Sequence, residues 1–374
     1  MPITFTYPLT LQVLTALAVA LVISLIATPP VKWFAERVGA IDIPKDSRRI
    51  HCVPIPRLGG LAIFIGFVLS VVLFAEIDRA IQGILLGSVL IVFVGVVDDI
   101  LQLKAWQKFS AQVIAALIPV FHGVTIDLIS NPNIFSGYPY LNLGIFIIPL
   151  TVLWIVGITN AVNLIDGLDG LAVGVSTISS LTMLVVALLV TADGNVALIL
   201  AALAGACLGF MPYNLNPAKI FMGDTGALLL GYLLATMSIL GLFKFYAIIS
   251  FAVPFMALAL PILDTAFAII RRVIRGQSPM APDRGHFHHR LLDIGYSQKQ
   301  AVFIIYLISG FLGMIAVIMT SSGQVRIVFT LLTFLVVGAT VLVAFRGTLL
   351  RPSNKCQVCD TEAEAEKGDN HAPD

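Results

Sequence analysis

The chain has 374 residues and a formal net charge of +1; 58% of its residues are hydrophobic and only 11% are charged. Soluble globular domains carry about 25% charged residues, so this composition excludes that class and indicates an integral membrane protein. The lipid bilayer is therefore the first expected partner. No nucleic-acid partner is expected, and the small net charge identifies no other partner.

Apolar runs long enough to cross a bilayer as helices, which requires roughly 20 residues each, follow one another along most of the chain. Eleven such runs lie at 9–29, 58–75, 80–97, 108–122, 143–159, 171–191, 195–211, 226–243, 247–270, 300–320 and 324–345. The first run has no cleavage-site pattern and is interpreted as a retained span. These runs predict an all-α, polytopic membrane protein.

The runs divide the chain into a transmembrane domain at 1–345 and a tail at 346–374, which we expect to be cytoplasmic and disordered. The tail is acidic and rich in alanine, a composition that favours disorder. Its Cys356 and Cys359 form a lone CxxC. Without a second pair of ligands, a solvated tail is favoured over a zinc site.

The basic residues predict the orientation, because Lys and Arg near span ends favour the cytoplasm. With eleven spans and the N-terminus outside, the C-terminus lies inside. Of the 22 Lys and Arg residues, only Arg79, Lys244 and Arg326 then fall on the outer side. We therefore expect a multi-pass protein whose N-terminus faces outward.

The first acidic segment, VVDDILQLKAWQKFSAQ, follows the third run and contains Asp98, Asp99 and Lys108. An ionised side chain in hydrocarbon costs about 2.5 kcal/mol or more, and a helix C-terminus disfavours negative charge by roughly 0.3 to 1 kcal/mol. The aspartate pair therefore requires a cation, either a metal ion or Lys108. The alternative is that both are juxtamembrane charges that extend into the headgroup region.

A second polar segment, NAVNLIDGLDGLA, places Asn163, Asp166 and Asp169 after the fifth run. Gly167 and Gly170 lie beside the two aspartates, which indicates an interrupted helix whose backbone and carboxylates face a ligand. We expect this segment to contribute to a site at the inner end of the spans.

A third segment, PYNLNPAKIFMGDTGALLLG, contains Asn214, Phe221 and Asp224 just before the eighth run. Taken alone, Asp224 would also fit a helix N-cap. Under the predicted topology, however, all three polar segments lie on the inner face. Their shared position favours one common site over three unrelated features.

Two inner loops are basic. The segment DRGHFHHRLLD contains His286, His288, His289 and Arg290, and the segment DSRRIHCVPIPRLGG contains Arg57. The histidines would also suit a transition metal, but the surrounding arginines repel a cation and attract phosphate, which favours anion binding. For most of the arginines in the first loop, the positive-inside signal is an alternative explanation.

Carboxylates, amides, a lysine and a basic rim together suit a magnesium-bound diphosphate. Magnesium prefers oxygen ligands and binds through one or two carboxylates together with substrate phosphates. The sequence contains no GxxxxGK[ST] motif, so a P-loop nucleotide hydrolase is not supported. The predicted ligand is therefore a diphosphate with its metal ion.

The segments VVDDI…K, NAVNLIDGLDGLA, FMGDTGALLLG and HFHH resemble, in order and spacing, those of the polyprenyl-phosphate N-acetylhexosamine-1-phosphate transferases, over roughly 30–298. The resemblance implies transfer of a sugar 1-phosphate from a UDP-sugar to undecaprenyl phosphate, release of UMP, and Mg²⁺ or Mn²⁺ as cofactor. The loops HCVPIPRLGG and HFHHRLLD are similar to the bacterial branch that uses UDP-GlcNAc. The branch that uses UDP-MurNAc-pentapeptide is the alternative.

The resemblance also implies roles for individual residues. Metal ligation falls to Asp224 and Asn163. Catalytic roles fall to Asp98, Asp99, Lys108 and Asp166, of which Asp98 is implied to position or deprotonate the lipid phosphate. Substrate binding falls to Asp169, Asn214, Phe221, His286, His288, His289, Arg290 and Arg57. For Asp166, contact with the metal and contact with the substrate both stay open.

The implied setting is the bacterial cytoplasmic membrane, with the site on its cytoplasmic face and a product that enters envelope polymers such as lipopolysaccharide O-antigen or teichoic acid. A homodimer is one assembly left open. An ion-coupled transporter is the alternative class, because it too buries carboxylates among helices. Only Asp264, about two turns from the inner end of its run, lies clearly inside a span, at 3.6 residues per turn. Transport is therefore the less favoured class.

Overall fold

A computed structural model describes residues 8–43, 54–126, 128–130, 140–190, 194–241, 255–274 and 286–321, together with 326–333 except 329 and 332. The expected tail with its CxxC and most of the expected span at 324–345 lie outside the described residues. Every residue predicted for the site lies within them.

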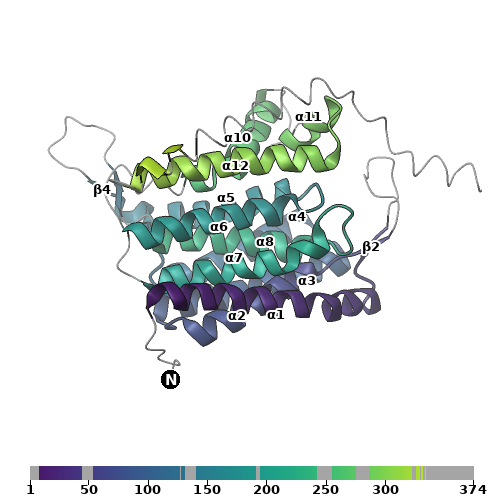
Figure 1. The fold of residues 1–374 in the computed structure, drawn as a ribbon, viewed down its shortest axis with the longest axis horizontal. Helices are drawn as coiled ribbons and strands as arrows, with labels where there is room; N and C mark the ends of the chain where they lie inside the picture. Colours follow the sequence, from purple (N-terminus) through teal and green to yellow (C-terminus); the bar gives the residue numbers. More distant parts are fainter. Residues whose placement is uncertain are drawn as a thin grey trace, which may run out of the picture.

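The described chain consists mainly of helices, with two short antiparallel hairpins (Figure 1). The α-helices are α1 (Leu9–Arg37), α2 (Gly59–Phe74), α3 (Arg79–Leu101), α4 (Ala105–Phe121), α5 (Ile147–Ile165), α6 (Leu171–Val190), α7 (Gly194–Asn214), α8 (Gly223–Gly241), α10 (Ala259–Ile274), α11 (Phe287–Asp293) and α12 (Gln298–Thr320). A short 3₁₀ helix, η1 (Gly144–Phe146), leads into α5. The hairpins pair β1 (Ile41–Asp42) with β2 (Ile55–Pro56) and β3 (Leu128–Ser130) with β4 (Tyr140–Asn142).

Among the described residues, seven helices are long and apolar enough to cross a membrane: α1, α3, α5 with η1, α6, α7, α8 and α12. The shorter α2 is also apolar. The prediction of an all-α, polytopic membrane protein is therefore confirmed. The number of eleven spans and the orientation stay predictions.

Some helices extend past the apolar runs into the polar segments. Helix α3 continues to Leu101, so Asp98 and Asp99 belong to its last turn. Helix α5 continues to Ile165 and includes Asn163. These polar residues remain helical because their side chains find partners on neighbouring helices, as described below.

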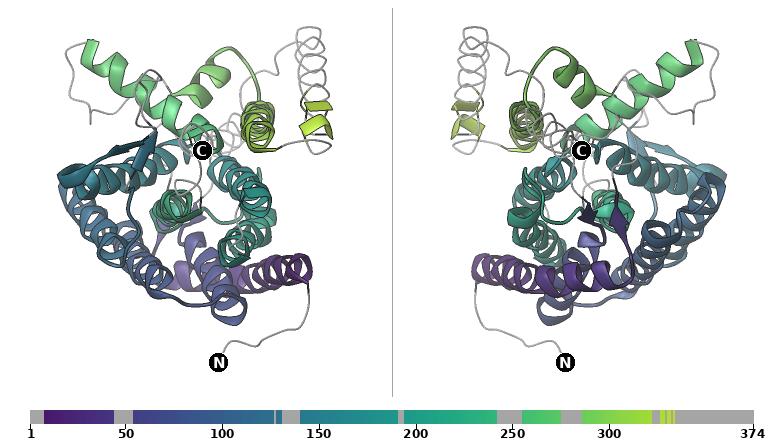
Figure 2. Two further views of the ribbon diagram at one scale, coloured as in Figure 1. Left: turned by 90° about the vertical axis from the view of Figure 1, so that its left-hand side faces the viewer. Right: turned by 90° about the vertical axis from the view of Figure 1, so that its right-hand side faces the viewer.

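Helix α8 lies in the middle of the bundle. In the end-on views of Figure 2 the other helices surround it, and its main neighbours are α3 and α5, followed by α2 and α6. Every residue at 225–239 is buried. Because α8 is buried from Thr225 onward, the N–H groups of its first turn are best satisfied by protein partners.

Glycines let the neighbouring helices approach the start of α8. A Cβ on Gly95 of α3 would lie 2.4 Å from the Cα of Thr225, and a Cβ on Gly60 of α2 would lie 2.1 Å from the backbone nitrogen of Gly226. Small residues at such contacts allow helix backbones in membranes to pack closely. These two glycines therefore determine how closely α2 and α3 approach the N-terminus of α8.

The first hairpin continues this packing at the same end of the bundle. Beyond β2, the backbone N–H groups of Gly59 and Gly60 donate to the carbonyl oxygens of Phe221 and Met222, at 3.0 and 2.9 Å. The N–H of Phe221 donates in return to the carbonyl oxygen of Pro56, at 2.8 Å. Figure 1 places β2 and β4 at opposite ends of the bundle. The first loop is thus joined to the residues that precede α8.

Helices α10, α11 and α12 cover one side of the bundle. Helix α12 packs on α6 and contacts α11, and α10 packs on α5 and α12. Helix α10 projects from the bundle at an angle (Figure 2). It lies within the described part of the expected span at 247–270, and it continues to Ile274.

The Gly95→Ala substitution is expected to lower the stability of the protein. The added methyl group would overlap Thr225, and overpacking of this kind typically costs about 1–3 kcal/mol. Thermal unfolding in detergent should show a lower midpoint than for the wild type. The matched control is Gly310→Ala in α12, where nothing lies within 4 Å of the added Cβ. A Gly95→Ala protein as stable as this control would contradict the proposed close packing.

Candidate active site

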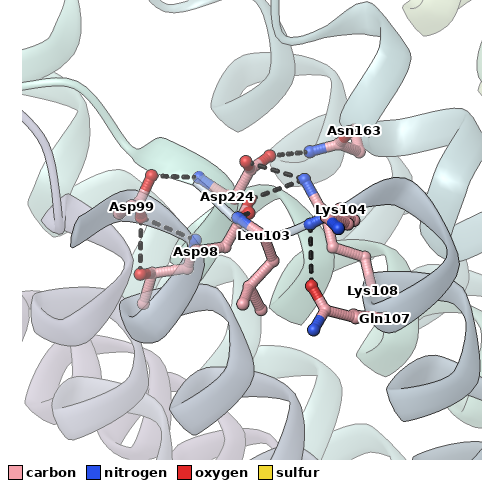
Figure 3. A network of polar contacts seen from close by, with 9 residues as sticks. Asp98, Asp99, Leu103, Lys104, Gln107, Lys108, Asn163 and Asp224 are labelled. Carbon is pink, nitrogen blue, oxygen red and sulfur yellow. Dashed lines mark hydrogen bonds and ion pairs between the residues drawn. The ribbon is translucent and has the colours of Figure 1, made fainter. Parts of the chain in front are cut away.

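Three polar segments meet at one end of the bundle, around the ammonium group of Lys108 (Figure 3). Its Nζ lies 2.6 Å from Oδ2 of Asp98 and 2.8 Å from Oδ2 of Asp224. The side chain of Asn163 donates to Oδ1 of Asp224 at 2.5 Å. The ends of α3 and α5 and the starts of α4 and α8 therefore contribute to one network.

Asp99 holds the buried start of α8. Its Oδ1 accepts the N–H of Asp224 at 3.0 Å, and its Oδ2 accepts the N–H and the hydroxyl of Thr225 at 3.0 and 2.7 Å. Gly223 adopts a φ of +71°, and a Cβ there would lie 2.4 Å from the Asp99 carboxylate. A negative charge at a helix N-terminus is also favoured by the helix dipole. Asp99 thus supplies the acceptors that a side-chain cap within α8 would otherwise provide.

These contacts distinguish the two interpretations of Asp224, as a helix N-cap or as part of a polar site. The backbone N–H of Asp224 is satisfied by Asp99. Its carboxylate is therefore not needed as a helix cap, and it faces Lys108 and Asn163 instead. Asp224 belongs to the polar network rather than to the helix terminus alone.

The carboxylate of Asp98 stabilises the turn between α3 and α4, which precedes Lys108. Its Oδ1 accepts the N–H of Leu103 at 2.7 Å, across a turn in which Gln102 has a φ of +54°. At the start of helix α4, Oε1 of Gln107 accepts the backbone N–H of Lys104 at 3.0 Å. Lys108 follows one turn later, so the cation expected beside the aspartates is supplied by the protein itself.

A second polar layer lies one helical turn deeper between α4 and α5. The side chain of Asn160 donates to Oε1 of Gln112 at 2.5 Å and to the carbonyl oxygen of Val156 at 2.8 Å. Gln112 is buried. This pair joins the two helices that carry Lys108 and Asn163.

The turn after α5 is joined to the loop between α7 and α8. Oδ2 of Asp169 accepts the side-chain N–H of Asn216 at 2.9 Å and the N–H of Ala218 at 3.1 Å. Asn214 accepts the N–H of Gly170 at 3.1 Å and donates to the carbonyl oxygen of Ile220 at 3.0 Å. Asp169 and Asn214 therefore hold the turn and the loop together, and their predicted contacts with a nucleotide stay predictions.

Asp166 follows the last residue of α5 and lies near the other carboxylates. Burial raises the pKa of Asp166 to about 8, and nearby Asp224, Asp99 and Asp169 raise it further while Arg57 opposes them. The carboxyl group would therefore hold a proton at neutral pH unless a further cation were bound. The carboxyl groups of Asp99, Asp166, Asp169 and Asp224 thus lie close enough together to disfavour ionisation of Asp166.

The histidine segment, at the start of α11, packs against the turn after α5. His288 is 2% exposed, and a Cβ on Gly167 would lie 2.4 Å from its Nε2. Burial lowers the pKa of His288 to about 4, and His289 beside it adds to this effect. His288 is therefore neutral at pH 7 and packs directly on the turn that carries Asp166.

The remaining predicted residues lie around this centre. Arg57 forms an ion pair with Asp42 of β1 at 2.7 Å, and Arg290 is exposed on α11. Phe221 is half-buried, and its backbone pairs with the residues that precede α2. Their predicted contacts with substrate stay predictions.

The donor set can be compared with the needs of a divalent cation. In the described part of the chain, no group of three or more His, Cys, Asp and Glu side chains is arranged to hold a metal ion. Magnesium needs only one or two carboxylates when substrate phosphates complete its shell. The carboxylate of Asp224 fits a cation that arrives with a diphosphate. Asn163 faces this carboxylate with its amide nitrogen, and its ligation of a metal ion stays a prediction.

Several residues of the network were not predicted from the sequence. Thr225 follows Asp224 directly, but no sequence pattern marks its hydroxyl as a partner of Asp99. Gln112 and Asn216 carry no motif that marks them. For Asp264 the sequence indicates only a carboxylate inside a span, whereas in the structure this carboxylate accepts a hydrogen bond from the ring of His286 at 2.9 Å.

The central part of the chain matches a known protein family. Residues 81–242 match the model of glycosyl transferase family 4. This segment contains Asp98, Lys108, Asn163 and Asp224, so the central network lies entirely inside the match.

Full-length relatives cover most of the chain. It is 43% identical over 339 residues to a probable undecaprenyl-phosphate N-acetylglucosaminyl 1-phosphate transferase of Bacillus subtilis, with 88% of this chain and 92% of the relative covered. It is 39% identical over 315 residues to a decaprenyl-phosphate N-acetylglucosaminephosphotransferase of Mycobacterium tuberculosis, with coverages of 77% and 78%. It is 30% identical over 341 residues to a phospho-N-acetylmuramoyl-pentapeptide-transferase of Desulfitobacterium hafniense, with coverages of 84% and 99%.

The Asp99→Asn substitution is expected to destabilise the protein. Asparagine offers one acceptor oxygen in place of two, so at least one donor at the start of α8 loses its partner, at a cost of about 1–3 kcal/mol. Thermal unfolding in detergent measures the change. Thr225→Val is the matched comparison, because it removes one donor and leaves both carboxylate oxygens with backbone partners. If Asp99→Asn were no less stable than Thr225→Val, the capping role of Asp99 would be wrong.

Proposed function

Because the chain belongs to glycosyl transferase family 4, with relatives 43% and 39% identical over most of their length, we propose that it transfers N-acetylglucosamine 1-phosphate from UDP-GlcNAc to undecaprenyl phosphate. The products are undecaprenyl-diphosphate-GlcNAc and UMP. In the coarser terms that its relatives share, the chain is a polyprenyl-phosphate N-acetylhexosamine-1-phosphate transferase and a multi-pass membrane enzyme.

The observation that supports this proposal is the network around Lys108. Its ammonium group lies between the carboxylates of Asp98 and Asp224, at the end of an apolar bundle. A fixed cation with adjacent carboxylates suits a diphosphate that brings its own metal ion. A position at the end of the bundle also suits one water-soluble substrate and one substrate whose chain lies in the bilayer.

The choice of UDP-GlcNAc follows from two features. The relatives at 43% and 39% identity are named for N-acetylglucosamine, whereas the relative at 30% is named for N-acetylmuramoyl-pentapeptide. The loops HCVPIPRLGG and HFHHRLLD favour the same branch. The acceptor is taken as undecaprenyl phosphate, after the relative that is 43% identical.

The reaction is assigned to the cytoplasmic face of the bacterial cytoplasmic membrane. UDP-sugars are cytosolic. The segments assigned to the inside are those that carry most of the Lys and Arg residues, because basic residues near span ends favour the cytoplasmic side. The three polar segments that form the network belong to this side. The product would enter envelope polysaccharides.

In the proposed reaction, an oxygen of the lipid phosphate attacks the sugar-linked phosphorus of the UDP-sugar, and the bond to UMP breaks. Asp98 positions or deprotonates the lipid phosphate, and Lys108 offsets charge on the diphosphate. Asp224 and Asn163 would hold Mg²⁺ or Mn²⁺, which when bound supplies charge neutralisation of the diphosphate and of the departing UMP. One phosphoanhydride replaces another, so the reaction should reverse when UMP is added.

The other residues act around this centre. Asp99 is assigned to positioning Asp224, because its carboxylate is occupied by the start of α8. Asp169 and Asn214 maintain the loop that carries Phe221, whose ring is the proposed stacking partner of uracil. Asp166 lies beside the reacting phosphates. Arg57 and Arg290 are proposed to contact the anionic diphosphate, and His286, His288 and His289 are proposed to contact the donor substrate.

Purified protein is expected to release UMP from UDP-GlcNAc in the presence of undecaprenyl phosphate and Mg²⁺. A chelator should abolish the release, and added Mg²⁺ should restore it. UMP release is measured by chromatography, with UDP-MurNAc-pentapeptide as the competing donor. Turnover only with the pentapeptide donor would move the enzyme to the other branch, and turnover with neither donor would contradict the transferase proposal.

The Asp98→Asn substitution is expected to lower turnover by at least about 10²-fold, the typical contribution of a proton-transferring group. Asparagine keeps an oxygen that can accept the N–H of Leu103, so the turn should be preserved, but its amide nitrogen would face the ammonium group of Lys108, so the thermal midpoint should fall. Turnover is therefore compared at a temperature well below the midpoint of the variant. The control is Glu36→Gln, which neutralises an exposed carboxylate on α1 and should leave turnover unchanged. Wild-type turnover in the Asp98→Asn protein would remove this residue from the reaction.

A further inference from the structure

Asp264 joins α10 to α11 through both of its carboxylate oxygens. Oδ2 lies 2.9 Å from Nδ1 of His286, and Oδ1 accepts the backbone N–H of Phe287 at 2.8 Å. The side chains of His286 and Asp264 are only 6% and 9% exposed. The two residues lie 22 positions apart in the sequence, so this buried contact joins distant segments.

The contact fixes which ring nitrogen of His286 carries a proton. An ionised carboxylate has only acceptors, so the nitrogen that faces Asp264 must be a donor. In the neutral ring, Nδ1 is then protonated and Nε2 carries the lone pair. A carboxylate that orients an imidazole in this way also sets what the opposite nitrogen can bind.

The position of helix α11 depends on contacts with the rest of the protein, such as the one with Asp264. It has only seven residues, and helices this short are not stable in isolation. Helix α10, which provides the contact, packs on α5, the helix that carries Asn163. Asp264 thus ties the histidine helix to a helix of the central network.

The effect reaches the turn that contains Asp166. The ring of His286 is parallel to that of His288, with centroids 5.8 Å apart and an angle of 8° between the planes. His288 in turn packs on Gly167. Displacement of His286 would therefore displace the ring that lies against this turn.

We propose that Asp264 is a positioning residue for the nucleotide-sugar site: it fixes His286 with Nδ1 protonated and leaves Nε2 as the nitrogen available to the donor substrate. The inference rests on the proposed function, because it assigns the histidine helix to the donor substrate. It also explains a carboxylate inside an apolar run without invoking transport, since both oxygens of Asp264 are occupied by α11.

The Asp264→Asn substitution tests the proposal, because both partners of Asp264 are donors. Asparagine has one acceptor and one donor group, so it can satisfy either the ring of His286 or the N–H of Phe287, but not both. Size and shape are nearly unchanged. The matched control is Asp78→Asn, which alters a carboxylate that accepts the N–H of Ile81 at the start of α3.

Steady-state kinetics should separate the two substrates. Asp264→Asn is expected to raise the KM for UDP-GlcNAc about tenfold or more, while the KM for undecaprenyl phosphate and the thermal midpoint stay close to those of Asp78→Asn. Combining Asp264→Asn with His286→Ala should cost little beyond His286→Ala alone, because both changes remove the same contact. Equal increases in both KM values would indicate general loss of structure and overturn the proposal.

A spectroscopic measurement tests the contact independently of activity. In ¹⁵N-histidine-labelled protein in nanodiscs, His286 should show a protonated Nδ1 in the wild type, and so should His122, whose Nδ1 lies 2.7 Å from the carbonyl oxygen of Ile118. The signal of His286, identified by its loss in His286→Ala, should change in Asp264→Asn but not in Asp78→Asn. An unchanged signal would overturn the inference even if transfer is observed. If the wild type transfers no sugar phosphate but shows the expected signal change, the proposed function fails while the contact stands.

Discussion

The structure depends on the buried N-terminus of α8. This helix lies in the centre of the bundle, where every residue at 225–239 is buried, and Asp99 of α3 accepts two of its first N–H groups together with the hydroxyl of Thr225. The carboxylate is favoured there because a helix N-terminus carries partial positive charge. With α8 held in this way, Asp224 at its second residue is presented to the neighbouring helices.

The second feature is the balance of charge around Lys108. Taking carboxylates out of water is costly unless they are paired, and this lysine pairs with Asp98 and Asp224 at once. The pairing is incomplete, because Asp166 adds a further acidic group whose pKa is raised by burial. An apolar chain that keeps this excess of carboxylates is well suited to bind a cation together with a phosphate-containing substrate.

The elements around the network act mainly as supports. Asp169 and Asn214 join the turn after α5 to the loop before α8, and Asp264 joins α10 to the histidine helix. Each uses a polar side chain to satisfy backbone or ring donors from a distant segment. Polar residues such as Asp169 and Asn214, which the sequence suggests as substrate contacts, thus hold in position the segments that carry the residues facing the site.

The sequence by itself determined the apolar helices, the clustering of Asp98, Lys108, Asn163 and Asp224 in polar segments, and their family resemblance. These features depend on local composition. The length of an apolar run indicates a membrane span, and charged residues near the end of such a run indicate a functional site. Only the tertiary structure decided that Asp99 caps α8, that Asn214 bonds to two backbone groups, and that Asp264 holds His286. These partners are remote in sequence, and they are selected by how closely the helices pack, which at Gly60 and Gly95 depends on the absence of a Cβ atom.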